Sequence, residues 1–221
     1  MRKYEVVLFD LDGTLTASGE GITKSVQYAL NKMGKEEMGK DLRALEVFIG
    51  PPLLKQFMTF CDITEDEAEL AVKYYRERYT VTGIFENHPY PGVEELLKRL
   101  KEKGYLLCVA SSKPDHMVHI VLEHFHLEQY FDVIWGSDIN RPKMTKAQVI
   151  ELVLEELGYK DQKEKAVMVG DRSHDVEGAN QVGISCIGVT YGYGNQEELT
   201  QAGAWKIAET VEEIEEILGG K

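Results

Sequence analysis

Short runs of apolar residues alternate with longer amphipathic segments along most of the chain. The apolar runs are typical of buried β-strands and cover residues 4–9, 105–110, 131–135, 165–170, 184–189 and, more weakly, 204–208. The amphipathic segments have helical spacing and cover residues 92–103, 114–127, 144–157 and 173–182. Near-continuous apolar strands separated by helices are typical of a parallel sheet covered on both faces. The pattern therefore predicts an α/β fold, a Rossmann-like parallel sheet flanked by helices.

The pattern changes between residues 17 and 83, where no convincing strand occurs. Two long helical patterns fill this interval, one beginning near Ile22 and the other at Thr64, which is a candidate N-cap. We therefore predict an inserted, all-helical cap domain over residues 17–83. The two remaining segments, which form the predicted Rossmann-like core, are residues 1–16 and 84–221.

Composition and charge narrow the class of protein. Of the 221 residues, 43% are hydrophobic and 29% are charged, which is typical of a soluble globular protein. The net charge of −13 repels nucleic-acid phosphate, so we expect no nucleic-acid partner. The first apolar run, VVLF, is too short for a signal peptide or a membrane span, so we expect a cytoplasmic protein with no membrane partner. The three cysteines lack metal-ligand spacing and are expected to be reduced core residues.

Polar residues follow several of the predicted strands, where ligands bind in open parallel sheets. They are Asp10 and Asp12 after the first strand, Ser111, Ser112 and Lys113 after the second, and Asp171 and Asp175 after the fourth. Lys146 lies near the start of the helix before the fourth strand. These carboxylates, hydroxyls and lysines are expected to gather at one edge of the sheet.

Such a set of residues suits a hard cation and a phosphate group. Crowded carboxylates need a cation to offset their repulsion, and Mg²⁺ prefers oxygen ligands together with substrate phosphate. Asp10 is the candidate nucleophile that attacks phosphorus and forms an aspartyl-phosphate. Asp12 can protonate the leaving oxygen and then deprotonate the hydrolytic water. Gly13 gives the turn its freedom and lets backbone N–H groups approach the phosphate.

The motifs "DLDGT", "ASSKP", "TKAQVI" and "VGDRSHD", in this order, resemble those of the haloacid-dehalogenase superfamily of phosphatases. The resemblance covers nearly the whole chain. The helical insertion is similar to the small cap of the subfamily that includes phosphoglycolate phosphatases and β-phosphoglucomutases. The segments "FIGPPL" and "YGYGNQEEL" resemble the phosphoglycolate-phosphatase-like group in particular.

The resemblance implies a role for each matching residue. It makes Asp10 the nucleophile, Asp12 the acid/base, Ser111 the hydroxyl of the second motif and Lys146 the lysine of the third. Ser112 and Lys113 join Ser111 and Lys146 as candidate phosphate-binding residues. Mg²⁺ would be held by Asp10, the backbone carbonyl of Asp12 and Asp171, with Asp175 supporting it through water.

The chain departs from the family pattern at two places. Ala17 stands where many relatives carry an aspartate, which removes a polar contact at the cap hinge. The third motif lacks the commoner Lys-Pro pair and offers both Lys143 and Lys146, of which Lys146 better fits a helix start.

Other polar residues have two interpretations. Lys113 either lines the phosphate pocket or simply precedes a helix, and Arg43 and Lys55 either read the leaving group or are ordinary solvated charges. His174 is a candidate hydrogen-bonding neighbour of Asp171. One predicted helix carries several histidines, which we interpret as part of a partly exposed face. They are His116, His119, His124 and His126.

Together these features predict a Mg²⁺-dependent hydrolase of small phosphate monoesters, phosphoglycolate-like, that acts through an aspartyl-phosphate. The alternatives are a 5′-nucleotidase or sugar-phosphate phosphatase, a phosphate-transferring mutase, a halide-releasing dehalogenase and a non-catalytic phosphate-binding protein. Asp12 argues against the dehalogenase, since that chemistry has no use for a second aspartate. The expected partner is a small phosphorylated metabolite, and the expected assembly is a monomer or homodimer.

Overall fold

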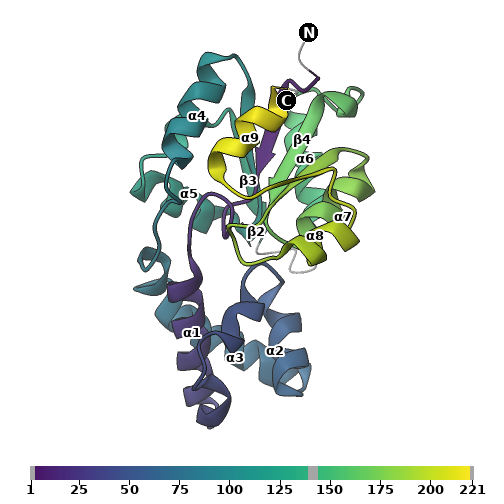
Figure 1. Ribbon diagram of the computed structural model, residues 1–221. Helices are drawn as coiled ribbons and strands as arrows, with labels where there is room; N and C mark the ends of the chain where they lie inside the picture. Colours follow the sequence, from purple (N-terminus) through teal and green to yellow (C-terminus); the bar gives the residue numbers. More distant parts are fainter. Residues whose placement is uncertain (1–2, 139–143, 220–221) are drawn as a thin grey trace. The chain divides into compact units, whose positions relative to one another are not determined.

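The computed structural model describes residues 3–138 and 144–219 (Figure 1). The chain divides into two units. The first, here the α/β unit, is formed by Met1–Thr16 and Pro89–Lys221, and the second, the helical unit, is formed by Ala17–His88. The chain thus returns to the α/β unit after residue 88, whereas the sequence placed this boundary after residue 83.

The α/β unit is built on a six-stranded sheet in the order β3-β2-β1-β4-β5-β6, and every neighbouring pair is parallel. The strands are β1 (Val6–Phe9), β2 (Leu106–Pro114), β3 (Val133–Ser137), β4 (Ala166–Gly170), β5 (Ser185–Val189) and β6 (Lys206–Ala208). The predicted fold class is therefore confirmed. The strand order reverses between β1 and β4, and such a reversal creates a crevice for ligands at the carboxyl ends of the strands.

One strand is longer than the sequence pattern predicted. The second apolar run ends at Ala110, but β2 continues to Pro114 with a shift in register between these two residues. The extension pairs with β3, where Pro114 lies opposite Ser137 and the Ser137 hydroxyl donates to the Ser112 carbonyl (2.8 Å). Pairing with β3, rather than apolar content, therefore carries this strand past the predicted end.

Helices cover both faces of the sheet (Figure 1). They are α4 (Val93–Glu102), α5 (Asp115–His124), α6 (Lys146–Glu156), α7 (Ser173–Val182), α8 (Gln196–Gln201) and α9 (Val211–Leu218), with short 3₁₀ turns η4 (Glu128–Tyr130) and η5 (Lys163–Lys165). Helices α6, α7 and α8 lie on one face, and α4, α5 and α9 lie on the other. The connections from β1 to β3 thus pack on one face and those from β3 to β6 on the other, which is the arrangement that right-handed crossovers produce.

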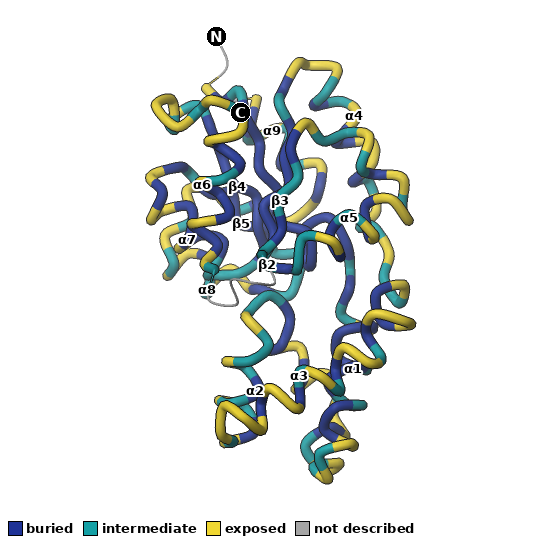
Figure 2. The backbone as a smooth tube through the Cα atoms, turned by 180° about the vertical axis from the view of Figure 1, so that it is seen from behind, coloured by how far each residue is buried: buried dark blue, intermediate teal, exposed yellow. Residues whose placement is uncertain are grey.

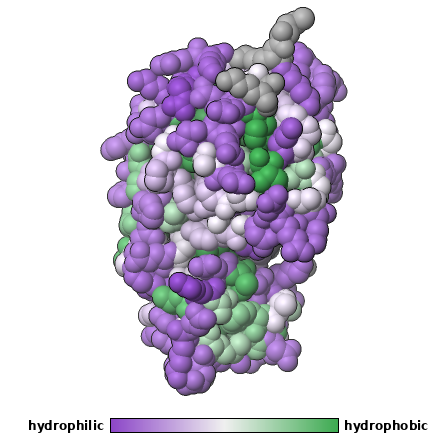
Figure 3. All heavy atoms as spheres, in the orientation of Figure 1, coloured by the Kyte–Doolittle hydropathy of each residue, from purple (hydrophilic) through white to green (hydrophobic). Residues whose placement is uncertain are grey.

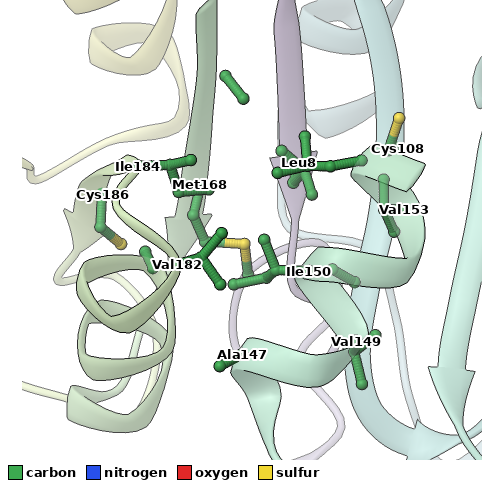
Figure 4. Packing of buried hydrophobic residues seen from close by; sticks show 14 of the residues in the cluster. Leu8, Cys108, Ala147, Val149, Ile150, Val153, Met168, Val182, Ile184 and Cys186 are labelled. Carbon is green, nitrogen blue, oxygen red and sulfur yellow. The ribbon is translucent and has the colours of Figure 1, made fainter. Parts of the chain in front are cut away.

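The side chains between the sheet and α6 and α7 form a continuous apolar cluster (Figure 4). Leu8 and Met168 project from the strands toward Ile150, Val153 and Val182 of the two helices. The central strands β1 and β4 are buried throughout, whereas the outer sides of the helices are exposed (Figure 2). On the face drawn in Figure 3, hydrophilic residues cover most of the surface, in keeping with the net charge of −13. Burial on both faces explains why the strand sequences are apolar without alternation.

The expected state of the cysteines is confirmed. Cys108 and Cys186 belong to the apolar cluster, Cys61 is buried in the helical unit, and all three are free. Burial raises the pKa of each thiol, so the three side chains remain neutral.

The helical unit consists of α-helices and short 3₁₀ helices. They are α1 (Gly19–Lys32), η1 (Glu36–Gly39), η2 (Ala44–Phe48), α2 (Leu53–Cys61), α3 (Glu65–Tyr79) and η3 (Gly83–Phe85). Thr64 caps α3 in a reciprocal capping box with Glu67. The Ala17 N–H donates to the His88 carbonyl (2.8 Å), so the two ends of this unit lie side by side. Within the described residues, every helix is too short or too polar to cross a lipid bilayer.

Candidate active site

Three buried aspartates meet at the carboxyl ends of β1 and β4. The two strands are paired in register, and the Asp10 N–H continues the ladder by donating to the Val169 carbonyl (2.9 Å). Asp171 follows β4, and Asp175 lies in the first turn of α7, where one of its oxygens accepts the Arg172 N–H (3.1 Å). One carboxylate oxygen from each aspartate lies within 4.8 Å of the others. Strand order and helix geometry thus bring together acids that are far apart in the sequence.

Lys146 lies in the midst of this cluster. It begins α6, directly after Thr145, which caps the helix in a box with Gln148. Its Nζ donates to Asp10 Oδ1 (2.6 Å) and to the Ala110 carbonyl (2.9 Å), and forms an ion pair with Asp175 Oδ1 (2.8 Å). The ammonium therefore has two hydrogen-bond acceptors and one ion-pair partner, and Lys146 as a whole is only 5% exposed. Lys143, the alternative third-motif lysine, lies outside the described residues.

Burial controls the protonation of these groups. It would lower the pKa of Lys146, but the carboxylates of Asp10 and Asp175 outweigh it and raise that pKa above the ordinary lysine value. Burial raises the pKa of Asp10, and burial together with the charges of Asp175 and Asp10 raises the pKa of Asp171 well above its usual range. The pKa of Asp175 is lowered, because Lys146 and His174 outweigh its burial. Asp171 is therefore the acid that most needs an added positive charge.

The cluster fits a divalent cation with oxygen ligands. Asp171 Oδ2 accepts the Tyr193 N–H (2.8 Å), whereas Asp171 Oδ1 is buried and has no hydrogen-bond partner among the described residues. When all three aspartates are ionised, Lys146 balances one of them and two negative charges remain. A buried, unsatisfied carboxylate oxygen next to a surplus of two charges is costly without a cation. Mg²⁺, with its preference for carboxylate ligands, suits this donor set.

Asp12 lies apart from the three-acid cluster. Its carboxylate is held by Lys113, whose Nζ lies 2.6 Å from Oδ2 and 2.9 Å from Oδ1, and both side chains are buried. The loop that follows Asp12 is tight. Gly13 has φ +89°, and a Cβ there would lie 2.1 Å from Asp171 Oδ2. Glycine at this position therefore lets the Asp10–Asp12 loop approach Asp171.

The two serines of the second motif differ in what they offer. Ser111 is buried, and its hydroxyl accepts the Lys113 N–H (3.3 Å). Ser112 is half-buried, and the contact that the structure gives it is made by its backbone carbonyl. Ser111 therefore contributes its side-chain hydroxyl next to Lys113, whereas Ser112 contributes its backbone carbonyl to strand pairing.

The other polar candidates lie in three different environments. His119 bonds Glu128 on the surface (2.7 Å), and among the described residues the only acid or histidine group suited to a metal is the aspartate cluster. His174 lies beside Asp175, with Nε2 3.6 Å from Asp175 Oδ1, instead of bonding near Asp171. Arg43 and Lys55 belong to the helical unit.

One part of the site was missed by sequence reasoning. The loop after β5, residues 190–195, lies against Asp171 and supplies the Tyr193 N–H. The available signal was the pair Gly192 and Gly194, which follows a strand at the edge where the acids lie. Glycines at such a place indicate close backbone approach.

A family described as haloacid dehalogenase-like hydrolase matches residues 7–189. The chain belongs to this family, as its motifs predicted, and the expectation of a phosphatase is confirmed. It is similar to a 5′-nucleotidase of Pseudomonas aeruginosa, with 45% identity over 89% of this chain and 87% of the relative.

Two further relatives carry different names. A tyrosine-protein kinase PtkA of Mycobacterium tuberculosis is 36% identical over 97% of this chain and 72% of its own length. A phosphoglycolate phosphatase of Aquifex aeolicus is 32% identical over 85% of each chain. Among solved structures, that of a predicted phosphatase from Clostridium acetobutylicum has a TM-score of 0.93 and 46% identity, and it covers 99% of each chain.

Proposed function

We propose that this phosphatase is Mg²⁺-dependent and hydrolyses a small phosphate monoester through an aspartyl-phosphate on Asp10. One observation carries the proposal: the buried Asp10 carboxylate lies beside Lys146 Nζ (2.6 Å), and one of its oxygens lies within 4.8 Å of oxygens of Asp171 and Asp175, close enough for the three to hold one cation. A carboxylate nucleophile next to fixed positive charge is the arrangement that phosphoryl transfer needs, because catalysis is mostly positioning and charge neutralisation.

The chain's own residues account for each bond change. An Asp10 oxygen attacks phosphorus, the bond from phosphorus to the leaving oxygen breaks, and Asp12, which enters the cycle as the protonated acid, donates its proton to that oxygen. Asp12 then takes a proton from a water molecule, which attacks phosphorus and breaks the bond to Asp10. Free phosphate leaves, and Asp10 and Asp12 return to their starting states. Lys146 orients Asp10 throughout, and Lys113 orients Asp12.

Asp10, Asp171 and Asp175 would hold the metal ion. When bound, Mg²⁺ neutralises the crowded carboxylates and stabilises the charge of the transferred phosphoryl group. Ser111 and Lys113 are the proposed contacts to the phosphoryl oxygens, since both are buried, Lys113 holds Asp12 and the Ser111 hydroxyl accepts the Lys113 N–H.

For the substrate we propose a nucleoside 5′-monophosphate, with phosphoglycolate as the second candidate. The relative named 5′-nucleotidase is 45% identical and the one named phosphoglycolate phosphatase is 32% identical. This order reverses the preference drawn from "FIGPPL" and "YGYGNQEEL". The helical unit is the proposed cap that selects the leaving group. A cytoplasmic location and a monomeric or homodimeric state stay predictions.

Release of free phosphate from a panel of monoesters tests this proposal. The panel contains nucleoside 5′-monophosphates, phosphoglycolate and sugar phosphates, each with Mg²⁺ or with EDTA. We expect Mg²⁺-dependent release, with the highest kcat/KM for a 5′-nucleotide. Higher kcat/KM for phosphoglycolate would overturn the substrate assignment alone, whereas no release from any ester would overturn the proposed function.

The nucleophile is tested by Asp10→Asn, because an amide cannot attack phosphorus. We expect kcat to fall by about four orders of magnitude or more, while circular dichroism stays native. Asp161→Asn, an exposed site in the same unit, is the matched control and should retain wild-type kcat. Wild-type turnover by Asp10→Asn would remove Asp10 from the reaction.

A further inference from the structure

The loop between β5 and α8 lies directly against the acid cluster, although none of its side chains was assigned a role above. Its backbone touches both walls of the site. A Cβ at Gly192 would lie 2.2 Å from the Gly13 carbonyl and 2.5 Å from Asp171 Cβ, and a Cβ at Gly194 would lie 1.9 Å from the Asp171 carbonyl. These gaps are too small for any side chain, so only glycine lets the loop come this close.

The loop also makes two directed hydrogen bonds. The Tyr193 N–H donates to Asp171 Oδ2 (2.8 Å), which leaves Oδ1 as the buried oxygen with no hydrogen-bond partner among the described residues. The Tyr191 hydroxyl donates to the Thr14 carbonyl (2.9 Å) in the loop that carries Asp10 and Asp12. One short segment therefore ties the metal ligand after β4 to the catalytic loop after β1.

A second tyrosine braces this arrangement. The ring of Tyr90 packs edge-on against that of Tyr191, with centroids 4.9 Å apart. Tyr90 is itself fixed, because its N–H donates to the Leu15 carbonyl (3.0 Å). Burial raises the pKa of both phenols, so they remain protonated donors at neutral pH.

We propose that residues Tyr191–Gly194 form a positioning element that aims Asp171 Oδ1 at the metal ion and holds it in register with Asp10. Its residues act through Asp171 and Thr14 without touching the substrate. Outer partners of this kind orient the ligands of a metal, and their loss typically weakens metal binding by about 10- to 100-fold. The inference rests on the proposed function only in that the acid cluster holds a cation.

Two variants test the element by different routes. Gly192→Ala places a methyl group against the Gly13 carbonyl and Asp171, and Tyr191→Phe removes only the hydroxyl that bonds Thr14. Mg²⁺ binding to the metal-free protein is measured by isothermal titration calorimetry, and competition with Tb³⁺ gives a second, independent reading. We expect the Kd for Mg²⁺ to rise about 10- to 100-fold in Gly192→Ala and several-fold in Tyr191→Phe.

The matched control is Tyr4→Phe. Tyr4 is buried, whereas Tyr191 is half-buried, and it too donates a hydrogen bond from its hydroxyl, of 2.8 Å to Ser185 at the opposite end of β5. It should lower the melting temperature as much as Tyr191→Phe does, while leaving the Kd for Mg²⁺ unchanged. In Tyr191→Phe, the KM at saturating Mg²⁺ should also stay near its wild-type value.

The outcomes separate the two proposals. A wild-type protein that binds no Mg²⁺ overturns the proposed function and this inference with it. A wild-type protein that binds Mg²⁺, with Gly192→Ala and Tyr191→Phe equally tight and both folded by circular dichroism, overturns the positioning element alone. If Gly192→Ala does not fold, Tyr191→Phe decides the matter.

Discussion

Two acid–lysine groups lie at the same edge of the sheet, and they differ in charge. In the first group, the Lys146 ammonium pairs with Asp10 and Asp175 while Asp171 lies within the same cluster, so three carboxylates stand against one ammonium. Around Lys113, a single carboxylate meets a single ammonium, and the pair is balanced. Both groups are buried, and each contains an aspartate of the same motif. The difference in net charge therefore indicates which group needs a cation. The first group could hold a metal ion, and in the proposed reaction the second holds the proton donor Asp12 in place.

Replacing each lysine in turn should give the largest difference in stability between the two groups. Lys146→Met leaves Asp10 and Asp175 buried without their partner, and we expect a loss of about 3–5 kcal/mol in the free energy of unfolding without metal. Lys113→Met leaves Asp12, which is 8% exposed, without its partner, and we expect the free energy of unfolding to fall by about 1–3 kcal/mol. Urea unfolding in EDTA measures both losses.

Mg²⁺ supplies the control for this pair of variants. Added Mg²⁺ should recover part of the stability lost by Lys146→Met, because the cation takes over some of the missing positive charge, and should recover little for Lys113→Met. Equal losses that Mg²⁺ leaves unchanged would mean that the two groups are electrostatically alike.

The pH dependence of metal binding provides the next test of the charge difference between the two groups. The raised pKa values of Asp10 and Asp171 mean that the metal-free folded state holds extra protons. The stability that these protons confer is complete below the ordinary carboxyl pKa and is lost as pH rises through the raised values. Mg²⁺ competes with the same protons, so the rise in Tm that it produces should be larger at pH 8 than at pH 5. Differential scanning calorimetry with Mg²⁺ or EDTA measures it.

Asp171→Asn provides the reference for that measurement. The amide cannot lose a proton, so most of the difference between the two pH values should disappear. The same Tm increment at both pH values in the wild-type protein would contradict the assignment of Asp171 as the acid that the metal neutralises.

The smallest effects are expected in the second motif, beside Lys113. Ser111→Ala removes a buried hydroxyl from the proposed phosphate site and should raise KM by about tenfold. Ser112→Ala should change KM less than about twofold, because the contact of Ser112 is made by its backbone carbonyl. Steady-state kinetics on the best ester of the panel compare the two. A larger effect for Ser112→Ala would place its side chain in the site.

The parts of this molecule that depend on periodicity could be predicted from the sequence. Apolar runs gave the six strands, and the rule that parallel strands end at one edge predicted that Asp10, Asp171 and Lys146 would meet. The sequence could not predict the partner of Lys113, because the extension of β2 and its shift in register determine where that side chain points. The loop at Tyr191 was missed for a similar reason: its role lies in backbone distances, which a glycine allows but does not specify.

The junction of the helical unit has a consequence for how such an enzyme is assembled. Thr16 forms an antiparallel bridge with Pro89, and the next residues outward, Ala17 and His88, are joined by a hydrogen bond. The chain therefore enters and leaves the helical unit at paired, neighbouring residues. A two-residue turn is long enough to join paired residues of this kind, so we expect that the helical unit can be replaced or removed without a change to any strand of the sheet.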